Sequence, residues 1–200
     1  MTVTVNIPTD HAARDRSVIE TISRRIRGKR RERRLSLDQL STRSGVSKGM
    51  LVQIERATTN PSIGTLCKVA AALGASIADL VDAAGPSRAG VVPAPGPRVL
   101  WKGPKGGSAT LLVGSTGPDM LELWTWELRP GERYDAIAHP DGTQELLHVT
   151  HGRLALTVDE VAVVITAGRS ASALTDRPHA YACLGRRPVR FTMVVAERHP

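Results

Sequence analysis

Four side chains that can carry proton-transfer or metal chemistry lie close together in the stretch AHPDGTQELLHVTHGR, residues 138–153. They are His139, Glu145, His148 and His151. Imidazole nitrogens and a carboxylate are donors that divalent transition metals accept, and two histidines with one carboxylate leave coordination positions open. The stretch is therefore either a metal-dependent active site or a binding site built from the same residues.

The back half of the chain, which carries this stretch, has the periodicity of β-strands. Segments 120–134, 145–158, 160–168 and 186–197 are short, rich in apolar β-formers and separated by Gly, Pro or Asp turns. Many short strands without long helices predict an all-β barrel or sandwich.

Strand alternation decides which histidines share a face with Glu145. If Glu145 points into the barrel, Leu147 and Val149 follow it inward and His148 points outward. His151 precedes a glycine turn. We therefore expect His148 and His151 to lie on the surface.

The front half has helical periodicity instead. An apolar stripe on a basic segment predicts a first helix, and Ser36 with Gln39 forms a capping box that begins a second. Gly45 ends that helix and Ser47 caps a third, which turns Leu51 and Ile54 inward; a fourth follows the NPS break, and a fifth begins at an S-x-x-D box. Five short helices predict a compact all-α domain.

Composition divides the chain into four parts. Residues 83–98, AAGPSRAGVVPAPGPR, contain several prolines and glycines and cannot sustain a helix. We expect a flexible polar tail over 1–16, a helical domain over 17–83, a linker over 84–98 and a β domain over 99–200.

The net charge of +8 is concentrated in the front half. Residues 1–85 carry 14 Lys and Arg against 8 Asp and Glu, and residues 86–200 carry 13 against 11. All six Trp, Tyr and Phe residues lie in the back half, so the front half has no platform on which unpaired bases could stack. These features favour a duplex nucleic acid as the anionic partner.

Neither the N-terminal segment nor the two cysteines point to a specific function. The N-terminal residues contain no apolar run that would suit a signal peptide, and no segment has the length of a membrane span, so we expect a cytoplasmic protein without a membrane partner. Cys67 and Cys183 fit no metal or redox spacing, and we expect two reduced thiols.

Residues 35–81 resemble the helix-turn-helix domain of the XRE, or phage-repressor-like, regulators. The resemblance includes the SGVS turn, the QIER end of the third helix and the TNPSIGTL entry to the fourth. It implies that the third helix enters a major groove, with base-facing and backbone-contacting residues. The base-facing residues would be Lys48, Gly49 and Gln53, and the backbone contacts would be Arg43, Ser47, Arg56 and Thr59.

Two features of this resemblance leave alternatives open. Lys48 and Gln53 could be solvated helix residues, and the eight basic residues within 24–34 could raise affinity for any DNA without reading its sequence. Ala57 stands where family members usually have Gly after the recognition helix, and Ala would be strained if the position needs a left-handed backbone.

Segments 130–152 and 168–185 are similar to the two motifs of a cupin barrel, a double-stranded β-helix or jelly roll. In the cupin pattern the metal ligands fall on Ile137, His139, Glu145 and His179, so three of four positions carry a ligand residue. The resemblance therefore implies a site for Zn, Fe, Ni or Mn at His139, Glu145 and His179. Ile137 argues against it, as does a second motif that departs from the pattern at Leu174, Asp176 and Cys183.

The alternative to a metal centre is a pocket for an organic effector. The retained polar residues would then line the cavity together with Tyr181 and Trp126, although such aromatic residues are more often core. The predicted effector pocket consists of His139, Glu145, His179, Tyr181 and Trp126.

The two halves together resemble XRE-family transcription regulators with a C-terminal cupin sensor. That resemblance implies a non-enzymatic, homodimeric regulator that binds a palindromic operator in double-stranded DNA and responds to a small-molecule effector. Two alternatives remain: a metal-dependent cupin enzyme, of dioxygenase or isomerase type, fused to a DNA-binding domain, and a constitutive repressor whose barrel serves only to dimerise.

Overall fold

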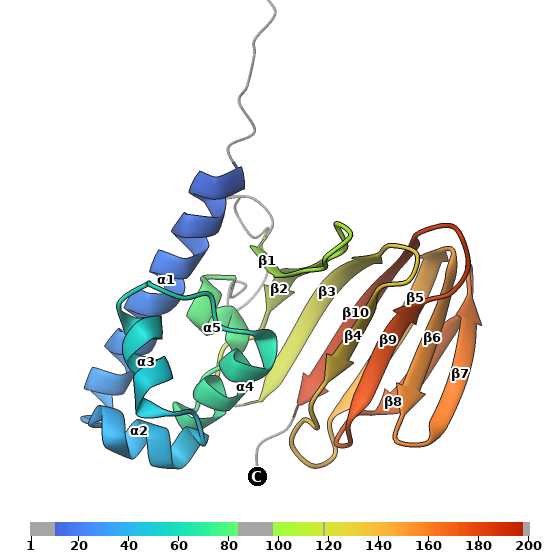
Figure 1. The fold of residues 1–200 in the computed structure, drawn as a ribbon. Helices are drawn as coiled ribbons and strands as arrows, with labels where there is room; N and C mark the ends of the chain where they lie inside the picture. The colour runs from blue at the N-terminus through green and yellow to red at the C-terminus, as the bar shows by residue number, and fades with distance from the viewer. Residues whose placement is uncertain (1–10, 84–97, 118, 198–200) are drawn as a thin grey trace, which may run out of the picture.

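The structure, a computed structural model, describes residues 11–83, 98–117 and 119–197, with side chains from residue 16 onward. Figure 1 shows a helical unit beside one end of a β unit. The five helices are α1 (His11–Glu32), α2 (Leu37–Ser44), α3 (Lys48–Glu55), α4 (Ile63–Ala72) and α5 (Ile77–Val81).

Short polar residues at the helix ends fix where these helices begin and stop. Ser36 Oγ accepts the Gln39 N–H at 3.1 Å and Gln39 Oε1 accepts the Ser36 N–H at 2.8 Å, which completes the predicted capping box. Gly45 ends α2 with a φ of 65°, in the left-handed region. Ser47 caps α3, and Leu51 and Ile54 on α3 are buried, as predicted.

The first helix differs from the prediction. α1 begins at His11, so six of the residues expected in the tail over 1–16 are helical, and residues 1–10 lie outside the described residues. The segment HAARDR contains two alanines and two arginines, which favour helix, and the tail prediction gave its polarity too much weight. Ile22 and Ile26 form the buried stripe of α1.

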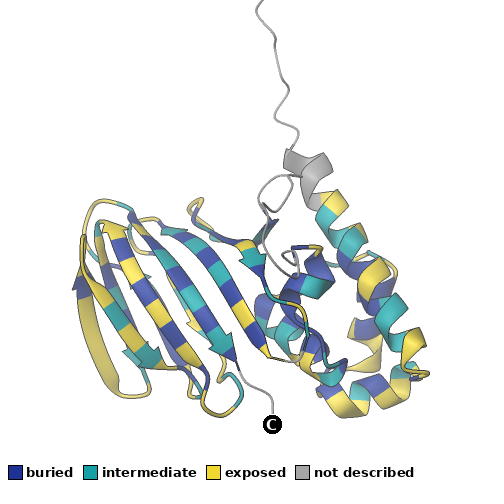
Figure 2. Cartoon of the chain, turned by 180° about the vertical axis from the view of Figure 1, so that it is seen from behind, coloured by how far each residue is buried: buried dark blue, intermediate teal, exposed yellow. Residues whose placement is uncertain are grey.

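In the described part of the chain, ten strands form two antiparallel sheets. The six-stranded sheet has the order β1-β2-β3-β10-β5-β8 and the four-stranded sheet the order β4-β9-β6-β7. Figure 2 shows buried and exposed residues alternating along the strands. The strands are β1 (Arg98–Lys102), β2 (Ser108–Gly114), β3 (Met120–Leu128), β4 (Arg133–Ala136), β5 (Gln144–His151), β6 (Arg153–Val158), β7 (Val161–Thr166), β8 (Ser170–Leu174), β9 (His179–Cys183) and β10 (Val189–Glu197).

An aromatic cluster fills the space between the sheets. Trp126 on β3 stacks on Phe191 of β10, with ring centroids 5.8 Å apart and planes 6° apart, and its ring also lies 5.5 Å from that of Tyr181. Such contacts add to the apolar area that the rings bury. The all-α and all-β units predicted from periodicity are thus both present.

The two units touch through α5 and β2. The Gly114 N–H donates to the Ala83 carbonyl at 3.1 Å, and the Ser76 hydroxyl donates to the Ser115 carbonyl at 2.7 Å. A Cβ on Gly114 would lie 2.5 Å from the Cβ of Ala78, so only glycine permits this approach.

Residues 84–97 of the expected linker lie outside the described residues. Arg98 was also assigned to the linker, and for this residue the prediction is wrong. Arg98 is the first residue of β1 and is buried. Its guanidinium donates to the Val81 carbonyl at 2.6 Å and to the Asp82 carbonyl, because the C-terminal carbonyls of α5 need donors. In the described part of the chain, no helix combines the length and apolarity required to span a bilayer.

Candidate functional site

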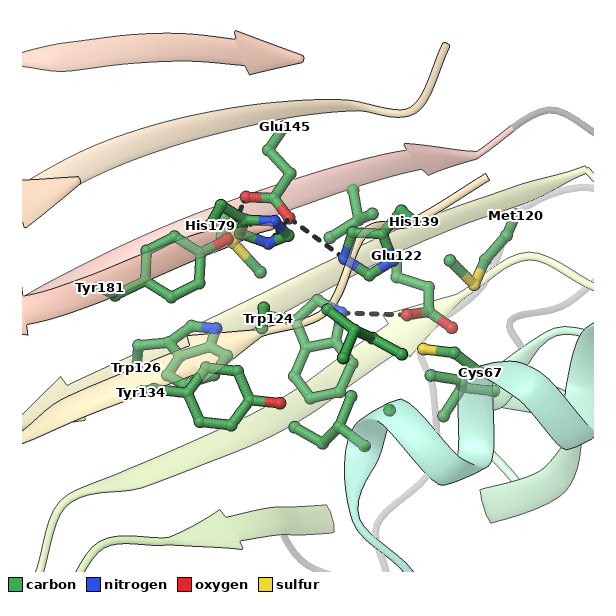
Figure 3. Close-up of a pocket in the computed structure, with 17 residues that line it drawn as sticks. Cys67, Met120, Glu122, Trp124, Trp126, Tyr134, His139, Glu145, His179 and Tyr181 are labelled. Carbon is green, nitrogen blue, oxygen red and sulfur yellow. Dashed lines mark hydrogen bonds and ion pairs between the residues drawn. The ribbon is translucent and has the colours of Figure 1, made fainter. Parts of the chain in front are cut away.

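Three polar side chains converge inside the β unit (Figure 3). His139 follows β4, Glu145 lies on β5 and His179 begins β9, so both sheets contribute. Glu145 Oε1 lies 3.6 Å from His139 Nε2 and 3.5 Å from His179 Nε2. The side chains of Glu145 and His179 are fully buried and that of His139 is 13% exposed. The structure therefore brings together the three predicted ligand residues, which we call the trio.

Hydrogen bonds outside the trio fix the orientation of two of its members. His179 Nδ1 lies 2.8 Å from the Arg177 carbonyl, which can only accept, so Nδ1 carries a proton and Nε2 faces the cavity. The Tyr181 hydroxyl donates to Glu145 Oε2, which leaves Oε1 free. Among the described residues, Glu145 Oε1 and His179 Nε2 are buried and have no hydrogen-bond partner.

These unpartnered atoms test whether a metal ion suits the site. Buried polar atoms are nearly always satisfied, and the ligand atoms of the trio all lie within 4.8 Å of one another. Two imidazole nitrogens and one carboxylate oxygen form a facial donor set for a divalent ion. The residues present therefore fit a metal, although Ile137, at the fourth cupin position, offers no donor.

The charge on Glu145 is stabilised by its neighbours. Burial would raise the pKa of Glu145, but His139, His179 and Tyr181 hold that pKa at about 2. Burial also opposes protonation of His179, yet the carboxylate raises the pKa of this imidazole above its usual value. The carboxylate is thus ionised across the neutral range, as binding a cation or a hydrogen-bond donor requires.

A cavity of about 40 Å³ adjoins the trio. Trp126 and Tyr181, both predicted for the effector pocket, line it. Trp124 and Tyr134 line it as well.

Glu122 also lines the cavity, and sequence reasoning missed it. It is 2% exposed and accepts the Trp124 indole N–H at 3.0 Å and the Ala78 N–H at 3.3 Å. Burial raises the pKa of Glu122 to about 7. The signal was present in the sequence, because Glu122 lies two residues before Trp124 on the inward face of an alternating strand.

The remaining histidines of the opening stretch are surface residues. His148 and His151 are exposed, and Leu147 and Val149 are buried beside Glu145. The prediction that strand alternation turns His148 outward and Leu147 and Val149 inward is confirmed.

The second candidate site is the outer face of α3. Lys48, Gly49 and Gln53 are all exposed, as contact with base edges requires. Lys48 Nζ lies 2.9 Å from a carboxylate oxygen of Asp38 on α2. Met50, which the sequence reasoning did not select, is 37% exposed on the same face and could touch a thymine methyl group. Of the predicted backbone contacts, Arg43, Ser47 and Arg56 are exposed and Thr59 is half-buried.

Arg30 differs from the expectation that the basic residues within 24–34 raise affinity for DNA, because its side chain is only 14% exposed. Its guanidinium pairs with the buried Glu55 of α3 through two hydrogen bonds, Nε to Oε1 at 2.6 Å and Nη2 to Oε2 at 2.9 Å. Arg30 therefore fixes α1 to the C-terminal end of α3. Ala57 has a φ of 57°, so the left-handed geometry expected where relatives have Gly is present.

Comparisons with known proteins agree with both domains. The helix-turn-helix family HTH_3 matches residues 21–80, and the cupin domain family Cupin_2 matches residues 124–195. The immunity repressor protein of Bacillus phage phi105 is 41% identical over 61 residues, which cover 30% of this chain and 42% of that protein.

Two further relatives extend over most of the chain. The HTH-type transcriptional regulator SutR of Escherichia coli K12 is 26% identical over 166 residues, 83% of this chain and 89% of SutR. The crystal structure of an HTH_3 family transcriptional regulator from Vibrio cholerae superposes with a TM-score of 0.72 at 27% identity, covering 92% of this chain and 99% of that one. The chain thus joins an XRE-type helix-turn-helix domain of the HTH_3 family to a cupin domain, and the relatives that match most of its length are transcriptional regulators.

Proposed function

We propose that the protein reads a specific duplex sequence through α3 and senses a ligand in the cupin barrel. The observation that carries the proposal is the pairing, in one chain, of an exposed recognition helix with a buried trio whose donor atoms are unpartnered. A regulator that responds to a ligand needs both a DNA-reading surface and a site that binds the ligand. The relatives that cover most of the chain are named as transcriptional regulators, which supports a sensor over an enzyme.

Sequence reading is assigned to Lys48, Gly49 and Gln53, and Arg43, Ser47, Arg56 and Thr59 hold the DNA backbone. The test is an electrophoretic shift on a duplex selected from a random library with the purified protein. Gln53→Ala should cost about 1–3 kcal/mol on that duplex and relax selectivity at one base pair. Gln144→Ala, at an exposed glutamine of the barrel, is the matched control and should bind like wild type. Equal binding by both variants contradicts the assignment.

The trio is assigned to a divalent metal, with Zn, Fe, Ni and Mn as the candidates. A bound ion would supply Lewis acidity and open coordination positions for an oxygen group of the effector. The aromatic wall suits an effector with an apolar body. His139→Ala should abolish stoichiometric Zn²⁺ uptake measured by calorimetry, whereas His148→Ala, at an exposed histidine, should not. Zn²⁺ uptake that neither substitution changes would remove the trio from the proposal.

A homodimer is the assembly we propose, because two recognition helices about 34 Å apart would match a palindromic operator. Its support is β7, an edge strand of the four-stranded sheet whose Val161, Val163 and Val164 are 66%, 44% and 53% exposed. Val164→Lys should shift the mass measured by light scattering from dimer to monomer. A wild-type monomer at micromolar concentration contradicts this part of the proposal.

A further inference from the structure

The wall of the barrel cavity that faces the helical unit is made by that unit itself. Ile63, Gly64 and Cys67 of α4 and Ile77 of α5 line the cavity opposite the trio. Figure 3 shows Cys67 on its helix with the sulfur directed toward Glu122. A sensor site that looks internal to the cupin domain therefore has residues from both units.

Ile137 forms the direct contact between the two walls. It lies after β4 at the position where the cupin pattern has its first ligand. A Cβ on Gly64 would lie 3.3 Å from Ile137 Cδ1 and 3.5 Å from Cγ1, so a glycine on α4 lets the helix approach this side chain closely. The residue that weakens the metal site is thus the residue that packs against the DNA-binding unit.

The cavity is partly open, but the space in it is too small for an organic effector. A water needs about 10–15 Å³ of such space, so a cavity of about 40 Å³ holds two or three waters, or an ion with a water. Drug-sized ligands occupy pockets of roughly 300 Å³ or more. An organic molecule that reaches the trio must therefore push a wall aside.

The attachment of the two units shows which wall can move. α5 is held by backbone and side-chain hydrogen bonds, among them Gly114 N–H to Ala83 and Ser76 to Ser115. On α4, the cavity contact is apolar and centres on Gly64. Ile63 and Leu66 of α4 are buried in the helical core that also holds Leu51 of α3, so a displaced α4 carries the recognition helix with it.

We propose that α4 is a stopper for the barrel: an effector larger than the present cavity enters only when α4 swings away from Ile137 about the α5 attachment. Occupancy of the trio by such a molecule and the docked position of the recognition helix then exclude each other. The regulatory role of this movement rests on the proposed sensor function. The structural part of the inference concerns only the contact between α4 and Ile137.

Cys67 offers a direct test, because it lines the cavity on the α4 side and is only partly exposed, so its thiol becomes more accessible when α4 moves away. In the full chain with Cys183→Ser, the labelling rate of Cys67 by dithiobis(nitrobenzoate) reports how often α4 opens. Gly64→Trp, a wedge between α4 and Ile137, should raise this rate by roughly tenfold or more. Lys68→Trp, on the exposed side of α4, is the matched control and should leave the rate unchanged.

Ile137→Ala provides a second route from the barrel side. Ile137 is 47% exposed, so its truncation spares the core and should also accelerate labelling. If circular dichroism shows both variants folded and neither labels faster than wild type, α4 is not the stopper. Faster labelling of Lys68→Trp as well overturns the inference, because the opening would not depend on the cavity contact. None of these outcomes requires DNA or effector binding, so failure here is distinguishable from failure of the proposed function.

Discussion

Replacing Glu122 by glutamine should stabilise the protein above neutral pH and destabilise it in acid. Glu122 is ionised in the unfolded chain above its ordinary pKa of 4.5, whereas burial raises its folded-state pKa to about 7. The folded state therefore holds the extra proton between these values, and stability falls as pH rises through that window. At 1.36 kcal/mol per pH unit, the loss above pH 7 is about 3 kcal/mol.

Glutamine removes this loss but cannot accept both hydrogen bonds that the two carboxyl oxygens accept from Trp124 and Ala78. One weakened bond costs about 1 kcal/mol at every pH. Glu122→Gln should thus be less stable than wild type by about 1 kcal/mol below pH 4.5, and more stable by about 2 kcal/mol above pH 7. The neighbouring Glu197 on β10 also raises the pKa of Glu122 and sharpens the effect.

Urea unfolding followed by tryptophan fluorescence measures the difference, because all three tryptophans lie in the β unit. The quantity of interest is the free energy of unfolding of Glu122→Gln minus that of wild type, from pH 4 to pH 8 (roughly the window of the pKa shift). Glu160→Gln, at an exposed glutamate, is the matched control and should show no pH-dependent difference. A difference for Glu122→Gln that does not change sign across this range refutes the reasoning.

Three further changes test the packing and the site. Gly152→Ala should destabilise the β unit by about 3 kcal/mol in urea unfolding, because φ is +75° and the new Cβ would lie 2.4 Å from a backbone oxygen. Gly142→Ala, where φ is +76° and the space is open, is the control and should cost only about 1 kcal/mol. Equal costs for the two variants would contradict this prediction. Glu55→Ala leaves Arg30 without its partner and should cost the helical unit about 3 kcal/mol by circular dichroism, unless the pair is not formed in solution. Tyr181→Phe removes the donor to the carboxylate of the trio and should weaken Zn²⁺ binding about tenfold in calorimetry, whereas unchanged affinity would show that the hydroxyl does not orient this ligand.

Local signals were sufficient to predict most elements of this fold. The Ser36 capping box and the Gly45 cap act within one or two turns of helix, so a few neighbouring residues determine them. The inward placement of Glu145 follows from alternation, which is equally local. The start of α1 was missed because helix propensity without an apolar stripe is a weak signal.

The contact between the two units could not be predicted. In the sequence, Gly64 and Cys67 have the pattern of ordinary residues of an amphipathic helix. No neighbouring residue indicates that Gly64 contacts Ile137 or that Cys67 faces Glu122. Gly64 and Ile137 lie 73 positions apart in the sequence, and Cys67 and Glu122 lie 55 positions apart, so only the folded arrangement identifies them as partners. The resemblance to a cupin located the trio, but the sequence alone did not show that the helical unit lines one wall of the cavity.

The position of Arg98 has a consequence for the integrity of the molecule when its chain is cut. Arg98 binds the carbonyls of Val81 and Asp82, and Ala83 binds Gly114, so residues 84–97 leave from and return to one tightly bonded junction. Covalent continuity across that segment is then not what keeps the two halves together. A protease cut at Arg88 should yield two fragments that elute as one particle under native conditions and separate only in denaturant. The two halves, co-expressed as separate polypeptides, should complement each other.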